Sequence, residues 1–260
     1  MHESRELIIE SGDQLLQPTT RRRFLAMLAV GGSILLLPAA FTACADDDSI
    51  TDPLLDPDRY RLDLSNDIGI LNYAYALEQV EAAFYTVALG SGGFNASSLV
   101  EKEVLVDLQR HEVVHREFLK QVLGAAALPE LGFSTATLGT LTASRDTLLS
   151  TAQLLEDTGV SAYNGAGKYL TNAANLLIAG KIVSVEARHA AAIRDIRDGP
   201  NGRKFAGDDV VNAQGLDVKA EPSTVLSSIT TLNVINSPLA IGTQPDADRS
   251  TPDFPAPTQT

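Results

Sequence analysis

Two short motifs, Glu112-Val113-Val114-His115 and Glu186-Ala187-Arg188-His189, decide the fold that we predict for this chain of 260 residues. With 13 Glu and four His in the chain, only about 0.2 Glu-x-x-His matches are expected by chance, so a pair of them is informative. Residues three apart lie on the same face of a helix. The Glu and the His of each motif could therefore reach a single ion.

Four long stretches around these motifs show the periodicity of amphipathic helices, and we expect helices near 65–89, 98–124, 142–166 and 172–198. Ala and Leu dominate the apolar residues, and both fill helices without crowding their rotamers. Helices of this length with short breaks between them are typical of a four-helix bundle. The predicted fold class is all-α.

The break between the second and third helices is longer than an up-down bundle needs. Residues 125–141 number 17, enough to span about 56 Å when fully extended, whereas a helix of 25 residues is about 37 Å long. The connection can therefore run the length of the bundle and start the third helix parallel to the second. We predict one long crossover between these two helices.

The core-facing positions of the four helices are apolar except at mid-height, where carboxylates and imidazoles occur. Burying several carboxylates together is unfavourable, because like charges cannot all ionise and each desolvation costs several kcal/mol. These positions contain no Lys or Arg that could neutralise them. Two divalent or trivalent metal ions would neutralise the carboxylates, with bridging Glu oxygens and terminal imidazoles as their ligands. The inward polar residues are Glu78, Glu81, Glu112, His115, Glu156, Glu186 and His189.

The bundle looks like a duplicated helical hairpin, because Glu78 and Glu156 are each followed by a Tyr seven residues later. We interpret those residues, Tyr85 and Tyr163, as core side chains with satisfied hydroxyls; the alternative is that they are redox groups near the metals or groups that contact the metal ligands. His111 lies off the core-facing positions and is expected to be solvated.

Residues 65–198 resemble the ferritin-like di-iron carboxylate family. Two segments, Leu77-Glu78-Gln79-Val80-Glu81-Ala82-Ala83-Phe84-Tyr85 and Val185-Glu186-Ala187-Arg188-His189-Ala190, resemble its exported bacterial branch, which includes desiccation-related proteins. The resemblance implies a ferritin-like bundle that holds two Fe or Mn ions. The ligands it implies are Glu78 and Glu156 as terminal groups, Glu112 and Glu186 as bridges, and His115 and His189. Glu81 is an alternative to Glu78, which we prefer because it shares the spacing to Tyr with Glu156.

The first 44 residues have the pattern of an export signal rather than of a folded domain. Thr20-Arg21-Arg22-Arg23-Phe24-Leu25 precedes an uncharged apolar run, and Arg21 and Arg22 resemble the pair of the twin-arginine signal. The run ends at Phe41-Thr42-Ala43-Cys44, which resembles a lipobox with Cys44 as the lipidated residue, although Phe41 replaces the usual aliphatic residue. Ordinary cleavage after Ala45 is the alternative.

These features divide the chain into a signal peptide (1–43), a tether (44–64), the bundle (65–198) and an irregular extension (199–260) with a short helix near 222–230. The net charge of −13 argues against nucleic-acid binding. The single Cys excludes an internal disulfide and a thiolate metal cluster.

We therefore expect an exported protein, in the periplasm or on the outer cell surface, held to the membrane only by its signal or a lipid anchor. The first functional hypothesis is a redox protein of the cell envelope, an oxidase or peroxide scavenger, that uses O₂ or peroxide at two Fe or Mn ions. The alternatives are non-catalytic metal storage and a structural role in stress or desiccation. No catalytic residue can be assigned from the sequence, and a homodimer is one expectation for the assembly.

Overall fold

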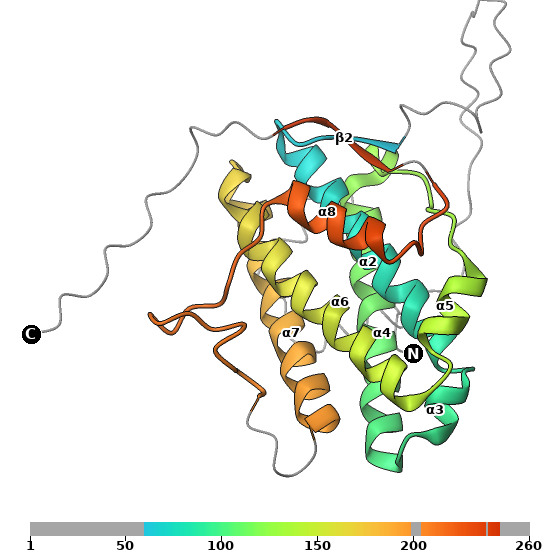
Figure 1. Ribbon diagram of the computed structural model, residues 1–260. Coiled ribbons are helices and arrows are strands. Elements are labelled where there is room, and N and C mark those ends of the chain that lie inside the picture. The colour runs from blue at the N-terminus through green and yellow to red at the C-terminus, as the bar shows by residue number, and fades with distance from the viewer. Residues whose placement is uncertain (1–59, 199–203, 238, 245–260) are drawn as a thin grey trace, which may run out of the picture. The chain divides into compact units, whose positions relative to one another are not determined.

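Four long helices dominate the computed structural model, which describes residues 60–198, 204–237 and 239–244 (Figure 1). They are α2 (Asp67–Ala88), α4 (Leu99–Leu123), α6 (Arg145–Ala166) and α7 (Ala173–Asp198). The end of each helix lies within three residues of its predicted position, and the predicted all-α bundle is confirmed.

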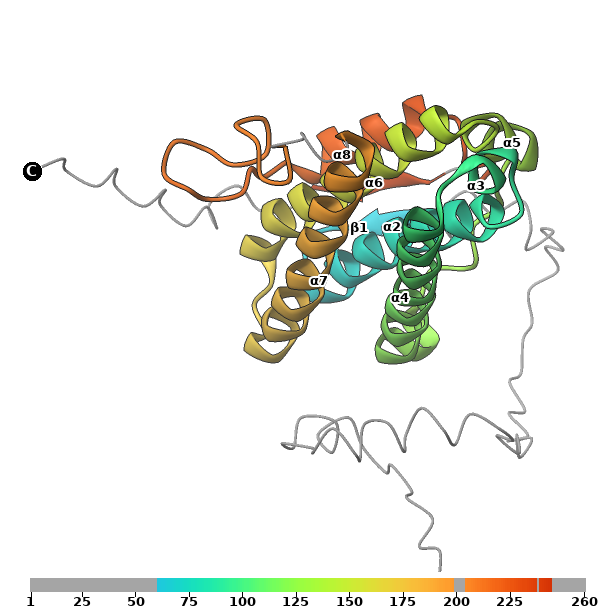
Figure 2. The same cartoon turned by 90° about the horizontal axis from the view of Figure 1, so that it is seen from below.

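The long helices pair as two hairpins, α2 with α4 and α6 with α7. A short helix, α3 (Gly92–Ala96), occupies the glycine-rich break between α2 and α4, where the sequence predicted only a break. Seen along the bundle, α4 and α7 lie on one side and α6 on the other (Figure 2). Each hairpin thus contributes one helix that carries a Glu-x-x-His motif.

The connection between α4 and α6 runs along α2. It is not a plain loop, because it contains a 3-10 turn, η3 (Gly124–Ala126), and the helix α5 (Thr135–Leu141). Asn72, near the start of α2, makes two hydrogen bonds of 2.6 and 2.8 Å to the backbone of the connection. Further along α2, the side chain of Gln79 accepts a hydrogen bond of 2.8 Å from the backbone of the connection. The backbone N–H of Gly93, beyond the end of α2, donates a hydrogen bond of 3.0 Å to the last part of the connection.

The first turns of α4 and α6 are neighbours. Arg145, the first residue of α6, forms a two-pronged ion pair with Glu101 in the first turn of α4. The two helices therefore start at the same end of the bundle and run parallel. This arrangement confirms the predicted long crossover.

The chain after α7 folds back onto the bundle. Arg194 is only 2% exposed and pairs with Asp157 on α6 at 2.7 Å and with Asp209 at 2.8 Å. Close packing also requires Gly165, because a Cβ there would lie 1.8 Å from the carbonyl oxygen of Ala220. The helix α8 (Pro222–Thr231) then packs against α6, with its proline in the first turn.

Segments on both sides of the four long helices share one hydrophobic core with them. The strand β1 (Arg61–Asp63) pairs in parallel with β2 (Ala240–Thr243), and Leu62 lies opposite Ile241. Leu62 of β1 and Val225 of α8 are each 1% exposed within that core. The folded unit thus joins residues that lie far apart in the sequence.

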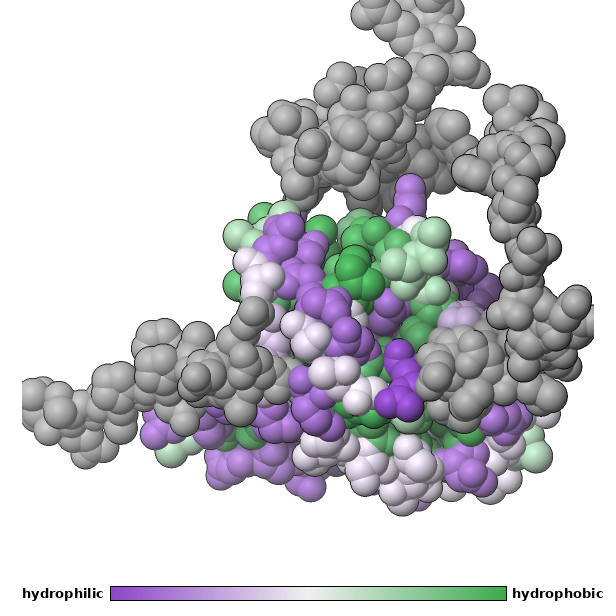
Figure 3. Space-filling model, turned by 90° about the horizontal axis from the view of Figure 1, so that it is seen from above, coloured by the Kyte–Doolittle hydropathy of each residue, from purple (hydrophilic) through white to green (hydrophobic). Residues whose placement is uncertain are grey.

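The surface of the bundle has mixed polarity at the end where α2 and α7 begin. Asp67 accepts a hydrogen bond of 2.8 Å from the backbone of Thr171 at this end, where Ile68, Leu176 and Leu177 are about half exposed. In the view from above, a group of hydrophobic residues is bordered by hydrophilic ones (Figure 3). Within the described ranges, no helix has both the length and the apolar character required for a membrane span.

Candidate metal centre

All six preferred ligand residues meet at mid-height in the bundle. The four glutamates Glu78, Glu112, Glu156 and Glu186 are fully buried, one on each long helix. The helices α4 and α7 each add a histidine one turn later, His115 and His189, because residues three apart share a helix face. The side chains form two groups, and within each group the candidate ligand atoms lie within 4.8 Å of one another.

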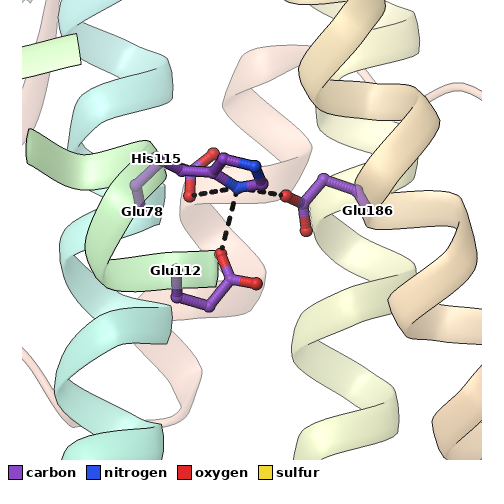
Figure 4. A group of neighbouring side chains, drawn as sticks. All are labelled: Glu78, Glu112, His115 and Glu186. Atoms are coloured by element: carbon purple, nitrogen blue, oxygen red, sulfur yellow. Dashed lines mark ion pairs between the residues drawn. The ribbon is translucent and has the colours of Figure 1, made fainter. Parts of the chain in front are cut away.

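The first group surrounds His115 (Figure 4). Nδ1 of His115 lies 2.8 Å from Oε1 of Glu186, 3.4 Å from Oε2 of Glu78 and 3.5 Å from Oε2 of Glu112. These side chains come from α2, α4 and α7, so the group joins both hairpins.

The second group surrounds His189 and repeats the first with α6 in place of α2. Nδ1 of His189 lies 2.7 Å from Oε1 of Glu112, 3.4 Å from Oε2 of Glu156 and 3.5 Å from Oε2 of Glu186. Glu112 and Glu186 thus turn one oxygen to each group, whereas Glu78 and Glu156 each face one group. This division matches two bridging and two terminal carboxylates.

Eight atoms of these six side chains are buried and make no hydrogen bond within the described part of the chain. They include both oxygens of Glu112 and Glu186 and Nδ1 of both histidines. Short distances do not satisfy them: Nδ1 of His189 and Oε1 of Glu112 are 2.7 Å apart, yet their geometry is not that of a hydrogen bond. Buried polar atoms are rarely left unpaired. Oxygen and imidazole donors aimed at shared regions fit a pair of hard or borderline metal ions.

In the absence of metal, burial and the neighbouring charges shift the pKa values of the carboxyl groups. Burial raises the pKa of Glu156 to about 7, although His189 opposes the shift. Burial and then the charge of Glu186 raise the pKa of Glu112 well above its usual range. Burial acts to raise the pKa of Glu186 as well, but the two histidines outweigh it and lower that pKa to about 2.

The histidines behave in the complementary way. Burial acts to lower the pKa of His115, but the surrounding carboxylates outweigh it and raise the pKa to about 12. His189 is shifted upward for the same reason. Without metal, protonated imidazoles therefore supply the positive charge that the glutamate cluster requires.

Two tyrosines hold the carboxylates of Glu78 and Glu156, each from the opposite hairpin. The hydroxyl of Tyr85 donates to Oε1 of Glu156 at 2.6 Å, and that of Tyr163 donates to Oε1 of Glu78 at 2.5 Å. Both hydroxyls are satisfied in the core, as the sequence predicted. Their partners, however, are the candidate ligands Glu156 and Glu78, so the tyrosines also contact ligand residues, as the alternative interpretation expected, and fix the direction in which these carboxylates point.

Glu81, the alternative to Glu78, is buried beside the two groups but belongs to neither. Its carboxylate lies over Gly159 of α6, where a Cβ would be 2.9 Å from Oε1 of Glu81. Burial raises the pKa of Glu81, and the charges of the four other glutamates add to the shift. Among the described residues, Glu78 rather than Glu81 directs an oxygen toward His115.

His111 was expected to be solvated, and this prediction is incomplete. The side chain is exposed, but its Nδ1 lies 2.9 Å from Nε2 of His189. The position of His111, four residues before His115, could have indicated that its side chain lies near the candidate ligands, because residues four apart share a helix face. The partner on α7 could not be inferred, since it depends on how the two hairpins pack.

The predicted export and lipidation residues, Arg21, Arg22 and Cys44, lie outside the described residues. No curated protein matches the chain in sequence. The model of the ferritin-like domain family matches residues 66–198, the segment that holds all four long helices and all six candidate ligands. This match and the geometry of the bundle lead to one assignment: the chain belongs to the ferritin-like domain family.

Proposed function

We propose that the chain binds a dinuclear Fe or Mn centre between its two helical hairpins. The observation that carries the proposal is the set of eight buried ligand atoms that converge from all four helices and make no hydrogen bond to any residue the structure describes. Glu112 and Glu186 each direct one oxygen to each group, which supports a bridging role for these two glutamates. The proposed ligand set is Glu78, Glu112, His115, Glu156, Glu186 and His189.

We infer that this centre is a redox site and that the protein acts in the cell envelope as an oxidase or a peroxide scavenger. The residues around the centre suit a redox site. Tyr85 and Tyr163 orient the terminal carboxylates, and full burial of the four glutamates excludes bulk water from their oxygens. Two bound Fe or Mn ions would supply the electron-transfer chemistry toward O₂ or peroxide. The alternative is a non-catalytic protein of metal storage or of stress and desiccation protection, as in the branch that the sequence resembles.

We further propose that the protein is exported in folded form and anchored by a lipid on Cys44. The support is the sequence order of the Arg21-Arg22 pair, an uncharged apolar run and the only Cys of the chain. Export through a twin-arginine route, which carries folded proteins, would let the metal centre assemble before export.

Metal analysis of the protein purified from its native envelope tests the proposal, followed by anaerobic titration of the metal-free protein with Fe²⁺ and Mn²⁺. A ligand that binds only the folded state raises the melting temperature. We expect two ions per chain and a higher melting point, and, for a redox protein, an absorbance change when O₂ or peroxide is admitted. Binding without any such change would favour storage.

A matched pair of variants on α4 makes the titration specific. Glu112→Gln removes the charge of a proposed bridge, whereas Glu117→Gln changes an exposed glutamate that pairs with its neighbour Arg116. We expect Glu112→Gln to abolish the metal-dependent rise in melting temperature and Glu117→Gln to leave it unchanged. Equal behaviour of the two variants would contradict the proposed ligand set.

A further inference from the structure

His111 and His189 form a pair that links the candidate centre to the surface. Their rings are nearly parallel, at 11°, with centroids 5.1 Å apart and the facing nitrogens 2.9 Å apart. Rings with this combination of distances lie edge to edge rather than face to face. The contact is therefore an in-plane hydrogen bond between the two imidazoles.

The direction of this hydrogen bond follows from the atom that faces the carboxylates. Nδ1 of His189 points at Glu112 and Glu156, so it is the nitrogen available to a metal ion. A neutral imidazole that ligates through Nδ1 carries its proton on Nε2. Nε2 of His189 then donates to Nδ1 of His111. His111 thus selects the tautomer and fixes the ring orientation of the ligand.

The other histidine, His115, has no such partner among the residues that the structure describes. Nδ1 of His115 also faces carboxylates, yet no hydrogen bond to its Nε2 is present within the described ranges. The duplicated sequence explains the difference: His111 directly precedes Glu112, and Val185 directly precedes Glu186. A valine side chain has no acceptor. The ligand residues of the two groups match, since each group combines both proposed bridging glutamates with one glutamate held by a tyrosine.

We propose that His111 is a positioning residue that makes the two metal positions unequal. This inference rests on the proposed function. The position with His189 binds the first ion and binds it more tightly than the position with His115. Outer partners of metal-ligating histidines typically change metal affinity by about 10–100-fold when they are removed.

Glu81 is the second break in the duplication, because Gly159 occupies the equivalent place on α6. Its carboxylate offers a rival cause for unequal positions. A variant of Glu81 therefore belongs in the test.

The test is an anaerobic titration of the intact metal-free protein with Co²⁺, followed by visible absorption and calorimetry. His111→Phe keeps a ring of similar shape but removes the acceptor, and His111→Asn keeps an acceptor oxygen near the place of Nδ1. We expect two binding steps in the original protein. His111→Phe should weaken the tighter step by about 10–100-fold so that the steps merge, and His111→Asn should restore them.

Rescue by Asn separates positioning from a general packing role, which would not depend on an acceptor atom. Glu81→Gln should leave two separate steps. Equal binding of both ions by the original protein, or merged steps in Glu81→Gln with no effect of His111→Phe, would overturn the inference while leaving the proposed function intact. Absence of any Co²⁺ binding by the original protein would overturn both.

Discussion

The hydroxyl of Tyr163 on α6 donates a hydrogen bond of 2.5 Å to Oε1 of Glu78 on α2. The duplicated pair, Tyr85 and Glu156, makes the same contact in the opposite direction. Each hairpin therefore orients one candidate ligand carboxylate of the other, Glu78 or Glu156. Because one oxygen of each carboxylate is held by a tyrosine, the other oxygen is left to face a histidine.

Tyr163→Phe should therefore destabilise the protein and weaken metal binding. The change leaves Oε1 of Glu78 buried without its donor, which costs about 1–3 kcal/mol in the free energy of unfolding. Chemical denaturation of the metal-free protein measures this loss, and titration with Mn²⁺ measures the affinity.

Tyr73→Phe is the matched control for Tyr163→Phe. Tyr73 is also buried, but its hydroxyl makes no hydrogen bond among the described residues. Removing it should be neutral or slightly stabilising. Similar losses for the two variants would show that the contact with Glu78 is not what matters.

The metal-free protein should lose stability as the pH rises from 5 to 8. The pKa of Glu156 is about 7 in the folded state, above its ordinary 4.5, so the folded protein holds more protons between these values. The pKa of His115, about 12 instead of 6.5, extends the same trend to higher pH. The low pKa of Glu186, about 2, acts only below pH 4.5, where stability should fall as the pH drops.

Calorimetric melting of the chelator-treated protein at several pH values checks this trend. Glu156→Gln should flatten it between pH 5 and 7, since the amide does not titrate. Metal should reverse the trend, because its binding displaces protons and becomes stronger at higher pH. A melting temperature of the metal-free protein that rises from pH 5 to 8 would contradict the account of the buried cluster.

Gly159→Ala tests whether the carboxylate of Glu81 occupies the space over Gly159. Ala normally stabilises a helix by about 1 kcal/mol relative to Gly, but the new Cβ would lie 2.9 Å from Oε1 of Glu81. We expect Gly159→Ala to stabilise a Glu81→Ala background by more than it stabilises the original protein, in which the carboxylate of Glu81 must move away from the new Cβ. A double-mutant cycle of unfolding free energies measures this coupling, and additive effects would mean that the two residues do not compete for the same space.

The export prediction concerns residues outside the described ranges and rests on sequence alone. Replacing Arg21 and Arg22 by Lys should retain the precursor in the cytoplasm, and Cys44→Ala should release the mature protein from the membrane fraction. Cell fractionation measures both outcomes. If Cys44→Ala fractionates with the membrane as before, cleavage after Ala45 or another mode of attachment replaces lipidation.

The sequence was most informative where the duplicated hairpin constrains it. Two Glu-x-x-His motifs and two Glu-to-Tyr spacings of seven predicted which side chains meet, because a helix fixes the direction of every residue once its core face is known. The length of residues 125–141 predicted the path of the crossover. It did not reveal α5 or the turn after α4, which depend on packing against α2.

The contacts that sequence could not supply join distant segments. The pairing of β1 with β2 links residues about 180 positions apart, and no local pattern encodes it. The contact of His111 with His189 depends on how two helices of different hairpins cross. Whether Glu78 or Glu81 faces His115 depends on a small rotation of α2 and on the space above Gly159.

Anomalous diffraction from crystals of the Mn²⁺-loaded protein tests the central claim most directly, because it locates each ion independently of any activity. The account predicts two peaks inside the bundle, one beside Nδ1 of His115 and one beside Nδ1 of His189, with Glu112 and Glu186 bridging them. Crystals that show no peak among these side chains, or that bind Mn²⁺ only on the protein surface, would contradict it.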